Sequence, residues 1–276
     1  MELDRARLLE PADLQALTTA GTDADLLIVD VGTAARFAQA HLPGASLVTP
    51  PELVSGIPPA SGRLPDDQRL ATLAQRLALT PETLVVAYDD EGGGWAGRLL
   101  WTLEVLGHSN WKYLDGGIHA WHAEGLPLTE VPSDRAKGET LPQLQLDLSP
   151  VAEANDVEAT IAGPGQIWDA RSFEEYSGSS VHAARGGHVP GARHLDWLDL
   201  MDRDRALRLR EDVADVISSA GLDLEAPIIT HCQSHHRSGL TWLVGRLLGL
   251  DIRAYHGSWS EWGNDPTRTV RTGAEP

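Results

Sequence analysis

Short apolar runs alternate with longer helical patterns along the whole chain. Residues 26–30 are an apolar run that ends in Asp30, residues 84–88 are a second apolar run, and both have the length typical of buried strands. Residues 66–79 carry leucines at helical spacing, and residues 97–106 form a further helical pattern that stops at a glycine. Because strands and helices alternate, the sequence predicts a parallel α/β sheet with helices on both faces.

The same order of elements occurs a second time, about 140 residues later. The motif HLPGA at 41–45 returns as HVPGA at 188–192, and three other segments recur in the same order. The second set of elements comprises strands at 167–169 and 227–231 and helices at 211–220 and 239–248. Four collinear matches are too many for chance, so the sequence predicts a duplicated unit.

A polar segment with four prolines, residues 127–150, separates the two units. Such a composition is typical of an extended linker. The sequence therefore predicts an α/β protein of two domains, residues 1–126 and residues 151–276, each a parallel sheet flanked by helices.

Composition and charge exclude several classes of function. The 276 residues are 42% hydrophobic, enough for a packed core, and 22 basic against 40 acidic residues give a net charge of -18. Such a surface repels phosphate backbones and anionic lipid, so neither nucleic acid nor a membrane is an expected partner. No apolar run reaches the ~20 residues of a membrane span. The acidic N-terminus lacks the apolar stretch of a secretory signal, so we expect a cytoplasmic protein.

The one cysteine of the chain, Cys232, lies between the strand at 227–231 and the helix at 239–248. Ligand sites of α/β sheets lie at this end of the strands, where loop N–H groups and the helix dipole favour an anion. A buried, inert thiol would explain the apolar strand before Cys232. It would not explain the polar and basic loop after it, so we expect a reactive thiol with a lowered pKa. The loop comprises Gln233, Ser234, His235, His236, Arg237 and Ser238.

Two other chemistries fit this loop less well. His235 and His236 are adjacent and point apart, and no third residue has ligand spacing, so no metal site is expected. A phosphatase loop of the same fold has arginine at the sixth position after cysteine. Here Arg237 is at the fifth position and Ser238 at the sixth, which disfavours a phosphatase.

Several motifs together resemble rhodaneses, the sulfurtransferases, in their tandem-domain form. They are Asp169 with Arg171, the segment 187–192, the loop 232–237 and the segment 255–262. The resemblance covers both halves. It implies that Cys232 takes sulfane sulfur from a small-molecule donor, forms a persulfide and passes the sulfur to cyanide or a thiol, with a protein as a further candidate acceptor. It implies neither a metal nor an organic cofactor.

The first unit has Asp89 at the position that matches Cys232, followed by Asp90 and Glu91. Tandem rhodaneses lack the cysteine in their first domain, so this unit is expected to be catalytically silent and to wall one side of the cleft. A non-catalytic redox or binding module is the alternative of a different class. Its mark would be a missing catalytic loop, which the first unit shows and the second does not.

The resemblance also suggests a donor. The loop Cys-Gln-Ser-His-His-Arg is basic and close to a variant of some bacterial tandem rhodaneses, whereas mercaptopyruvate enzymes usually have a small, neutral loop. Basic side chains suit a dianion, so thiosulfate is the expected donor and 3-mercaptopyruvate the alternative. Arg171 and Arg237 are the candidates to bind its anionic group, with the other loop residues as substrate contacts.

Two tryptophans are candidates to line the cleft. Trp95 lies in the loop of the first unit that matches the catalytic loop, and Trp197 follows the repeated Pro-Gly-Ala turn of the second. In a pseudo-symmetric pair these elements are expected to meet near Cys232. The alternative is that each indole packs in the core of its own unit.

Overall fold

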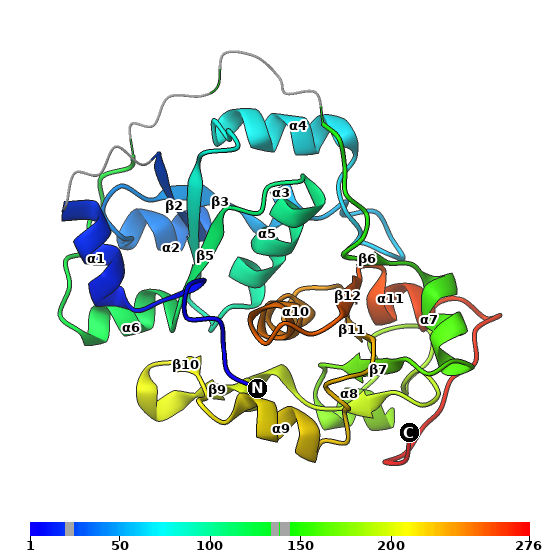
Figure 1. Ribbon diagram of the computed structural model, residues 1–276. Helices are drawn as coiled ribbons and strands as arrows, with labels where there is room; N and C mark the ends of the chain where they lie inside the picture. Colours follow the sequence, from blue (N-terminus) through cyan, green and yellow to red (C-terminus); the bar gives the residue numbers. More distant parts are fainter. Residues whose placement is uncertain (20–24, 134–137, 139–143) are drawn as a thin grey trace.

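The computed structural model describes residues 1–19, 25–133, 138 and 144–276, and it shows two halves built alike (Figure 1). Each half contains one five-stranded sheet whose strands all pair in parallel. Among the described residues, no helix is long and apolar enough to cross a membrane. The predicted fold class is confirmed.

The first sheet has the strand order β1-β5-β4-β2-β3. Its strands are β1 (Leu8–Leu9), β2 (Leu26–Val31), β3 (Ser46–Val48), β4 (Leu84–Tyr88) and β5 (Trp111–Leu114). Its helices are α1 (Pro11–Thr19), α2 (Ala34–Gln39), α3 (Pro50–Leu53), α4 (Asp67–Arg76), α5 (Gly94–Val105) and α6 (Gly117–Ala123). Strands β4 and β2 are central and buried, which is why both are apolar apart from Asp30 near the end of β2.

The second sheet repeats this topology with the order β6-β12-β11-β7-β8. Its strands are β6 (Val151–Ala152), β7 (Gln166–Asp169), β8 (Arg193–His194), β11 (Ile228–His231) and β12 (Ile252–Tyr255). Its helices are α7 (Ala154–Ile161), α8 (Phe173–Ser177), α9 (Val213–Ser219), α10 (Arg237–Leu247) and α11 (Ser258–Trp262). After β8 comes the 3-10 turn η1 (Trp197–Leu200), in the place that α3 takes after β3. It is followed by the 3-10 turn η2 (Arg203–Arg205) and the hairpin of β9 (Met201–Asp202) with β10 (Arg208–Leu209).

Helices α5 and α10 join the two halves and lie side by side at the centre of Figure 1. The largest apolar core draws residues from both halves, while a smaller core belongs to each half alone. The helices touch at Gly97 and Gly239. A Cβ on Gly97 would lie 2.3 Å from the Gly239 carbonyl oxygen, so only glycine allows this approach. The crossing brings the loops after β4 and β11 together, because each loop leads directly into one of these helices.

Both central helices begin earlier than the sequence predicted. We expected 97–106 and 239–248, and the helices start at Gly94 and Arg237. In the first case Gly93 adopts a left-handed φ of 104° and directs the chain into the helix, whereas a run of three glycines reads as loop.

The predicted linker is described only in part, since residues 134–137 and 139–143 lie outside the described residues. Thr129 forms an isolated antiparallel bridge with His41, so the segment continues along the first domain after residue 127. The domain limits 1–126 and 151–276 stay a prediction.

Candidate active site

Cys232 lies at the end of β11, and its side chain is 1% exposed. The corner between β12 and α11 holds its backbone. The Cys232 N–H donates to the Ser258 hydroxyl at 3.4 Å, and the Trp259 N–H donates to the Cys232 carbonyl at 3.0 Å. The Ser258 hydroxyl also accepts the His235 N–H at 3.0 Å. One residue of the segment 255–262 thus fixes both ends of the loop turn.

The Cys232 thiol is activated by its surroundings. Burial opposes the thiolate, but the charge of Arg237, the hydroxyl and N–H of Ser238, and the charge of His236 outweigh it and lower the pKa of Cys232 to about 7. The Ser238 hydroxyl lies 3.5 Å from the sulfur. The thiolate is therefore accessible near neutral pH, and it is the form that attacks sulfur.

Arg237 is the first residue of α10 and is held by a carboxylate of α8. Its two guanidinium nitrogens donate to Glu175 at 2.5 Å and 2.9 Å. The pair is mostly buried and bidentate, which fixes the direction of the guanidinium. Burial opposes ionisation of Glu175, but Arg237 holds the pKa of that carboxyl below its usual value.

His236 is the meeting point of the two domains. Its Nε2 contacts Glu91, which follows β4 in the first half, and its ring stacks on Trp95 with the centroids 4.3 Å apart. Trp197 of the second half lies on it as well, at 5.8 Å. The structure therefore brings both tryptophans predicted to line the cleft against the same loop residue.

His235 is turned away from the solvent. Its φ of 52° directs the side chain inward, where the ring lies edge-on to Trp101 and its Nδ1 contacts the Ser238 hydroxyl at 2.8 Å. Burial, with the charge of Arg98, lowers the pKa of His235 well below its usual value, so the ring is neutral. The expectation of a cationic substrate contact at His235 is not supported by this position.

Gln233 and Ser234 form the outer part of the loop and are half-buried. The Gln233 amide donates to the His182 carbonyl at 3.0 Å. Ser234 is covered by the first domain, since a Cβ on Gly62 would lie 2.0 Å from the Ser234 carbonyl oxygen. Both residues remain candidates to contact a donor at the entrance to the loop.

Arg171 occupies a different environment from the one the sequence suggested. It is 1% exposed, donates to Asp169 and to the Gly187 carbonyl at 2.6 Å and 2.7 Å, and stacks on Trp259 at 4.4 Å. Burial opposes ionisation of Asp169, yet Arg171 and His231 hold the pKa of that carboxyl well below its usual value. With its guanidinium enclosed and paired, the position of Arg171 supports a structural role rather than direct contact with an anionic donor.

Replacing Arg171 with methionine is therefore expected to destabilise the fold by about 3–5 kcal/mol, because Asp169 is left buried without its partner. Urea unfolding of purified variants measures the change. The matched control is Arg210→Met, which breaks an exposed pair with Asp212 and should change stability little. A stable Arg171→Met with a raised KM for the donor would instead restore the expected donor contact.

The matching loop of the first domain already holds an anion of its own. The Asp89 carboxylate accepts the N–H groups of Glu91, Gly92, Gly93 and Ala96 at 2.8–3.2 Å. Burial and the nearby Glu91 raise the pKa of Asp89 to about 6 despite these bonds. Because a carboxylate fills the amide cluster, no donor anion can bind there, which agrees with a silent first domain.

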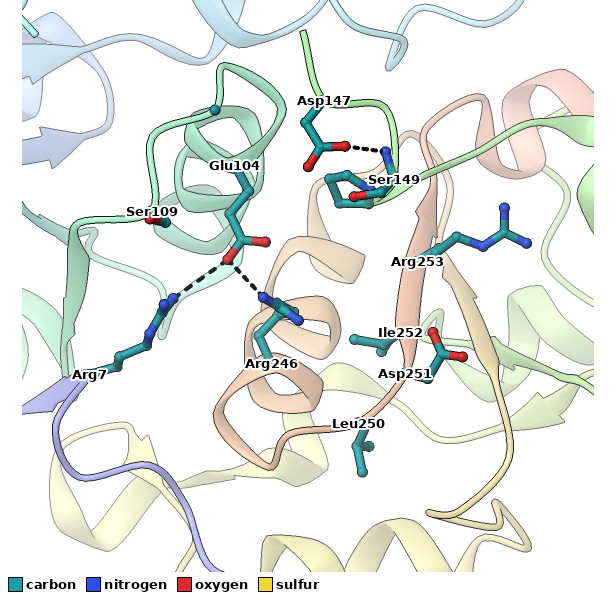
Figure 2. Close-up of a pocket in the computed structure, with 12 residues that line it drawn as sticks. Arg7, Glu104, Ser109, Asp147, Ser149, Arg246, Leu250, Asp251, Ile252 and Arg253 are labelled. Atoms are coloured by element: carbon teal, nitrogen blue, oxygen red, sulfur yellow. Dashed lines mark hydrogen bonds and ion pairs between the residues drawn. The ribbon is translucent and has the colours of Figure 1, made fainter. Parts of the chain in front are cut away.

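A separate cavity of about 490 Å³ lies at the C-terminal ends of α5 and α10, away from the catalytic loop (Figure 2). Arg7 and Arg246 point to Glu104 from opposite sides, at 3.5 Å and 3.2 Å. None of the predicted site residues lines it, and two of its cations are paired, so we interpret it as part of the domain interface. Within the described residues, no group of three or more His, Cys, Asp or Glu is placed to bind a metal ion.

The profile of the Rhodanese-like domain matches residues 10–124 and 153–265. The chain belongs to the rhodanese family. It is 45% identical to a thiosulfate sulfurtransferase of Azotobacter vinelandii, over 95% of this chain and 96% of that protein. A thiosulfate sulfurtransferase of Pseudomonas aeruginosa is also 45% identical, over 97% of each chain. The crystal structure of an anaerobic ergothioneine biosynthesis enzyme from Chlorobium limicola has the same fold, with a TM-score of 0.87 at 19% identity, covering 98% of this chain and 71% of that one.

Three residues of this rhodanese site were not predicted as such from the sequence. Ser258 lay within a recognised segment, but its role in holding the loop depends on a backbone turn with a φ of 53°. Glu91 and Arg98 come from the first domain, and the helix crossing brings them to the catalytic loop. A signal for Arg98 does exist, because it is the one cation in the helix Gly94–Val105, whose other residues are apolar apart from Thr102 and Glu104.

Loading the thiol with sulfur should change the intrinsic fluorescence, because Trp95 and Trp197 both flank His236 beside the catalytic loop. We expect fluorescence to fall when thiosulfate loads the protein and to recover when cyanide unloads it. Trp197→Phe and Trp95→Phe should each remove part of the change, with the larger loss for Trp197. Trp121→Phe is the matched control, since that indole lies in the core of the first domain alone. If Trp95→Phe and Trp197→Phe both kept the full fluorescence change, neither indole would be close enough to Cys232 to report its state.

Proposed function

We propose that this rhodanese is a thiosulfate sulfurtransferase that works through a persulfide on Cys232. The observation that carries the proposal is the buried Cys232 thiol, whose pKa of about 7 results from Arg237, Ser238 and His236 acting against burial. The near full-length identity of 45% to thiosulfate sulfurtransferases supports the same donor.

The reaction proceeds in two displacements at sulfur. The Cys232 thiolate attacks the outer sulfur of thiosulfate, an S–S bond forms, and the original S–S bond breaks with its electron pair on the departing sulfite. Cyanide or a thiolate then attacks the outer sulfur of the persulfide and leaves with it, which returns the Cys232 thiolate. Charge is conserved in both steps, and neither step needs a redox partner or a cofactor.

The charges around the loop favour a dianionic donor. Arg237 and His236 lie on the loop itself and stabilise the negative sulfur. The Arg237 side chain keeps 19% of its surface exposed, so its field reaches the entrance although Glu175 fixes its direction. Gln233, Ser234 and Ser238 supply neutral donors along the same loop. The acidic net charge of -18 acts against association at long range, but salt screens it beyond ~8–10 Å.

Formation of thiocyanate from cyanide tests this function, with thiosulfate and 3-mercaptopyruvate compared as donors at equal concentration. We expect a kcat/KM for thiosulfate at least about tenfold above that for 3-mercaptopyruvate, because Arg237 is held as a fixed cation in the loop. A preference for 3-mercaptopyruvate would make that compound the donor in place of thiosulfate. Transfer from neither donor would favour a non-catalytic redox or binding module.

The physiological acceptor and the location are further parts of the proposal. We propose a thiol acceptor in the cytoplasm, with a protein thiol as one form of it. Release of sulfite from thiosulfate in the presence of small thiols, followed beside the cyanide reaction, measures whether thiols serve as acceptors. An unchanged sulfite release on adding thiols would restrict transfer to cyanide among the acceptors tested.

A further inference from the structure

Arg98 is a fully buried cation directly behind the catalytic loop. It lies on α5 of the silent domain and is 0% exposed. Its guanidinium donates to the carbonyl of His235 in the catalytic loop at 3.4 Å and to the carbonyl of Leu53 at 2.6 Å. It also packs on the Trp101 ring at 4.6 Å. Arg98 is thus wedged between α3 of its own domain and the loop that carries Cys232.

No carboxylate in the described part of the chain forms an ion pair with Arg98, and its Nε has no hydrogen-bond partner there. Every other arginine named in the site is paired with an acid, as Arg237 is with Glu175 and Arg171 with Asp169. Burying an unpaired guanidinium is costly. Burial lowers the pKa of Arg98 to about 9, while the Cys232 thiolate acts in the opposite direction. Two carbonyl oxygens and the Trp101 ring contact this buried cation, and the Cys232 thiolate favours its charged form.

The pseudo-symmetry of the two domains shows that this cation is placed on one side only. Gly97 and Gly239 face each other at the helix crossing, so Arg98 and Leu240 hold corresponding positions on α5 and α10. Leu240 lies against the loop of the first domain, where a Cβ on Gly93 would be 2.8 Å from its Cδ1. The silent loop, whose anion Asp89 is already bonded to four N–H groups, thus faces a leucine. The catalytic loop, whose anion is Cys232, faces an arginine.

We propose that Arg98 is a positioning residue for sulfur transfer, supplied by the silent domain, which holds the His235 carbonyl and stabilises the anionic sulfur on Cys232 through its buried charge. The first domain then contributes to the chemistry as well as to the wall of the cleft. The proposal deepens the proposed function, but it concerns the resting thiolate and needs only that Cys232 is the nucleophile.

Other charged groups around the thiol set the size of the expected effect. Arg237 and His236 come from the loop and α10, Glu175 from α8, Glu91 from the loop after β4, and His235 and His256 lie on the side of Arg98. The charge of Arg237 is the largest favourable influence on the thiol, so the contribution of Arg98 should be smaller. Removing Arg98 is expected to raise the pKa of Cys232, by less than removing Arg237 does.

The rate of alkylation of Cys232 by iodoacetamide, measured against pH, tests the proposal because the thiolate is the reacting form. The variants are Arg98→Met, which keeps the bulk without the charge, and Arg98→Gln, which keeps a donor for the carbonyl groups. Both should move the alkylation midpoint upward. Leu99→Ala is the matched control: it opens a cavity at a buried neighbour on the same helix and should weaken the fold without moving the midpoint.

Three results would overturn the proposal: an unchanged midpoint in folded Arg98→Met, an unchanged midpoint in Arg98→Gln, or an equal shift in Leu99→Ala. If Arg98→Met does not fold, Arg98→Gln decides the question. Alkylation needs no sulfur donor, so its outcome is independent of the thiosulfate assay. A failed thiosulfate assay with a shifted midpoint removes the proposed donor and keeps the role of Arg98. Transfer from thiosulfate with an unchanged alkylation midpoint keeps the proposed donor and removes the role of Arg98.

Discussion

Cys232→Ala and Cys232→Ser are expected to lose sulfur transfer from thiosulfate by at least about a thousandfold, because the covalent route disappears with the nucleophile. A serine hydroxyl cannot hold a sulfane sulfur as a persulfide, and no other cysteine exists in the chain. The backbone of the loop should keep its conformation, since Ser258 and Trp259 hold it through main-chain atoms. Thiocyanate formation measures the loss, and unfolding curves of the same samples measure the fold.

Met201→Leu is the matched control for this substitution, because it replaces the sulfur of another buried side chain. It should keep transfer near the wild-type rate. Substantial transfer in a folded Cys232→Ala would mean that sulfur passes without a persulfide at this position, and the two-step route would then be wrong.

Arg237→Met is expected to raise the pKa of Cys232 from about 7 by on the order of one unit, because the largest favourable charge near the sulfur is removed. Because the thiolate is the reactive form, a higher pKa of Cys232 lowers the transfer rate at neutral pH. Below the raised pKa most of the thiol stays protonated, so transfer at pH 7 falls by about fivefold through ionisation alone. The loss should shrink as the pH rises above the new value. Any remaining loss at high pH reports direct contact of Arg237 with the donor.

The pH dependence of kcat/KM and of the alkylation rate should shift together in Arg237→Met. The control is Arg76→Met, an arginine that pairs with Glu52 away from the catalytic loop. An unchanged alkylation midpoint in Arg237→Met, or an equal shift in Arg76→Met, would contradict the role of the Arg237 charge.

The sequence predicted the elements of the fold well because its signals there are local. The apolar run of β4 is continuous since the strand is covered on both faces, and the repeated motifs revealed the duplication without any long-range information. The position of Cys232 between strand and helix followed from the same local patterns.

Side-chain roles depend on contacts that the local pattern does not contain. Arg171 was expected to meet the donor, but Asp169 two residues earlier takes its guanidinium into the core. His235 reads as one of a basic pair, and its left-handed backbone turns it inward while His236 stays half-exposed. Glu91 and Arg98 reach the site only because two glycines let α5 and α10 touch. Such residues cannot be assigned before the packing of the two domains is known.

The persulfide on Cys232 is the central claim, and mass spectrometry of the intact protein tests it most directly. After treatment with thiosulfate and removal of the excess, the account predicts that the protein gains the mass of one sulfur atom. The gain should map to the peptide containing Cys232, disappear on addition of cyanide with formation of an equal amount of thiocyanate, and be absent in Cys232→Ala. Thiocyanate formation without any sulfur adduct, or an adduct that persists in Cys232→Ala, would contradict it.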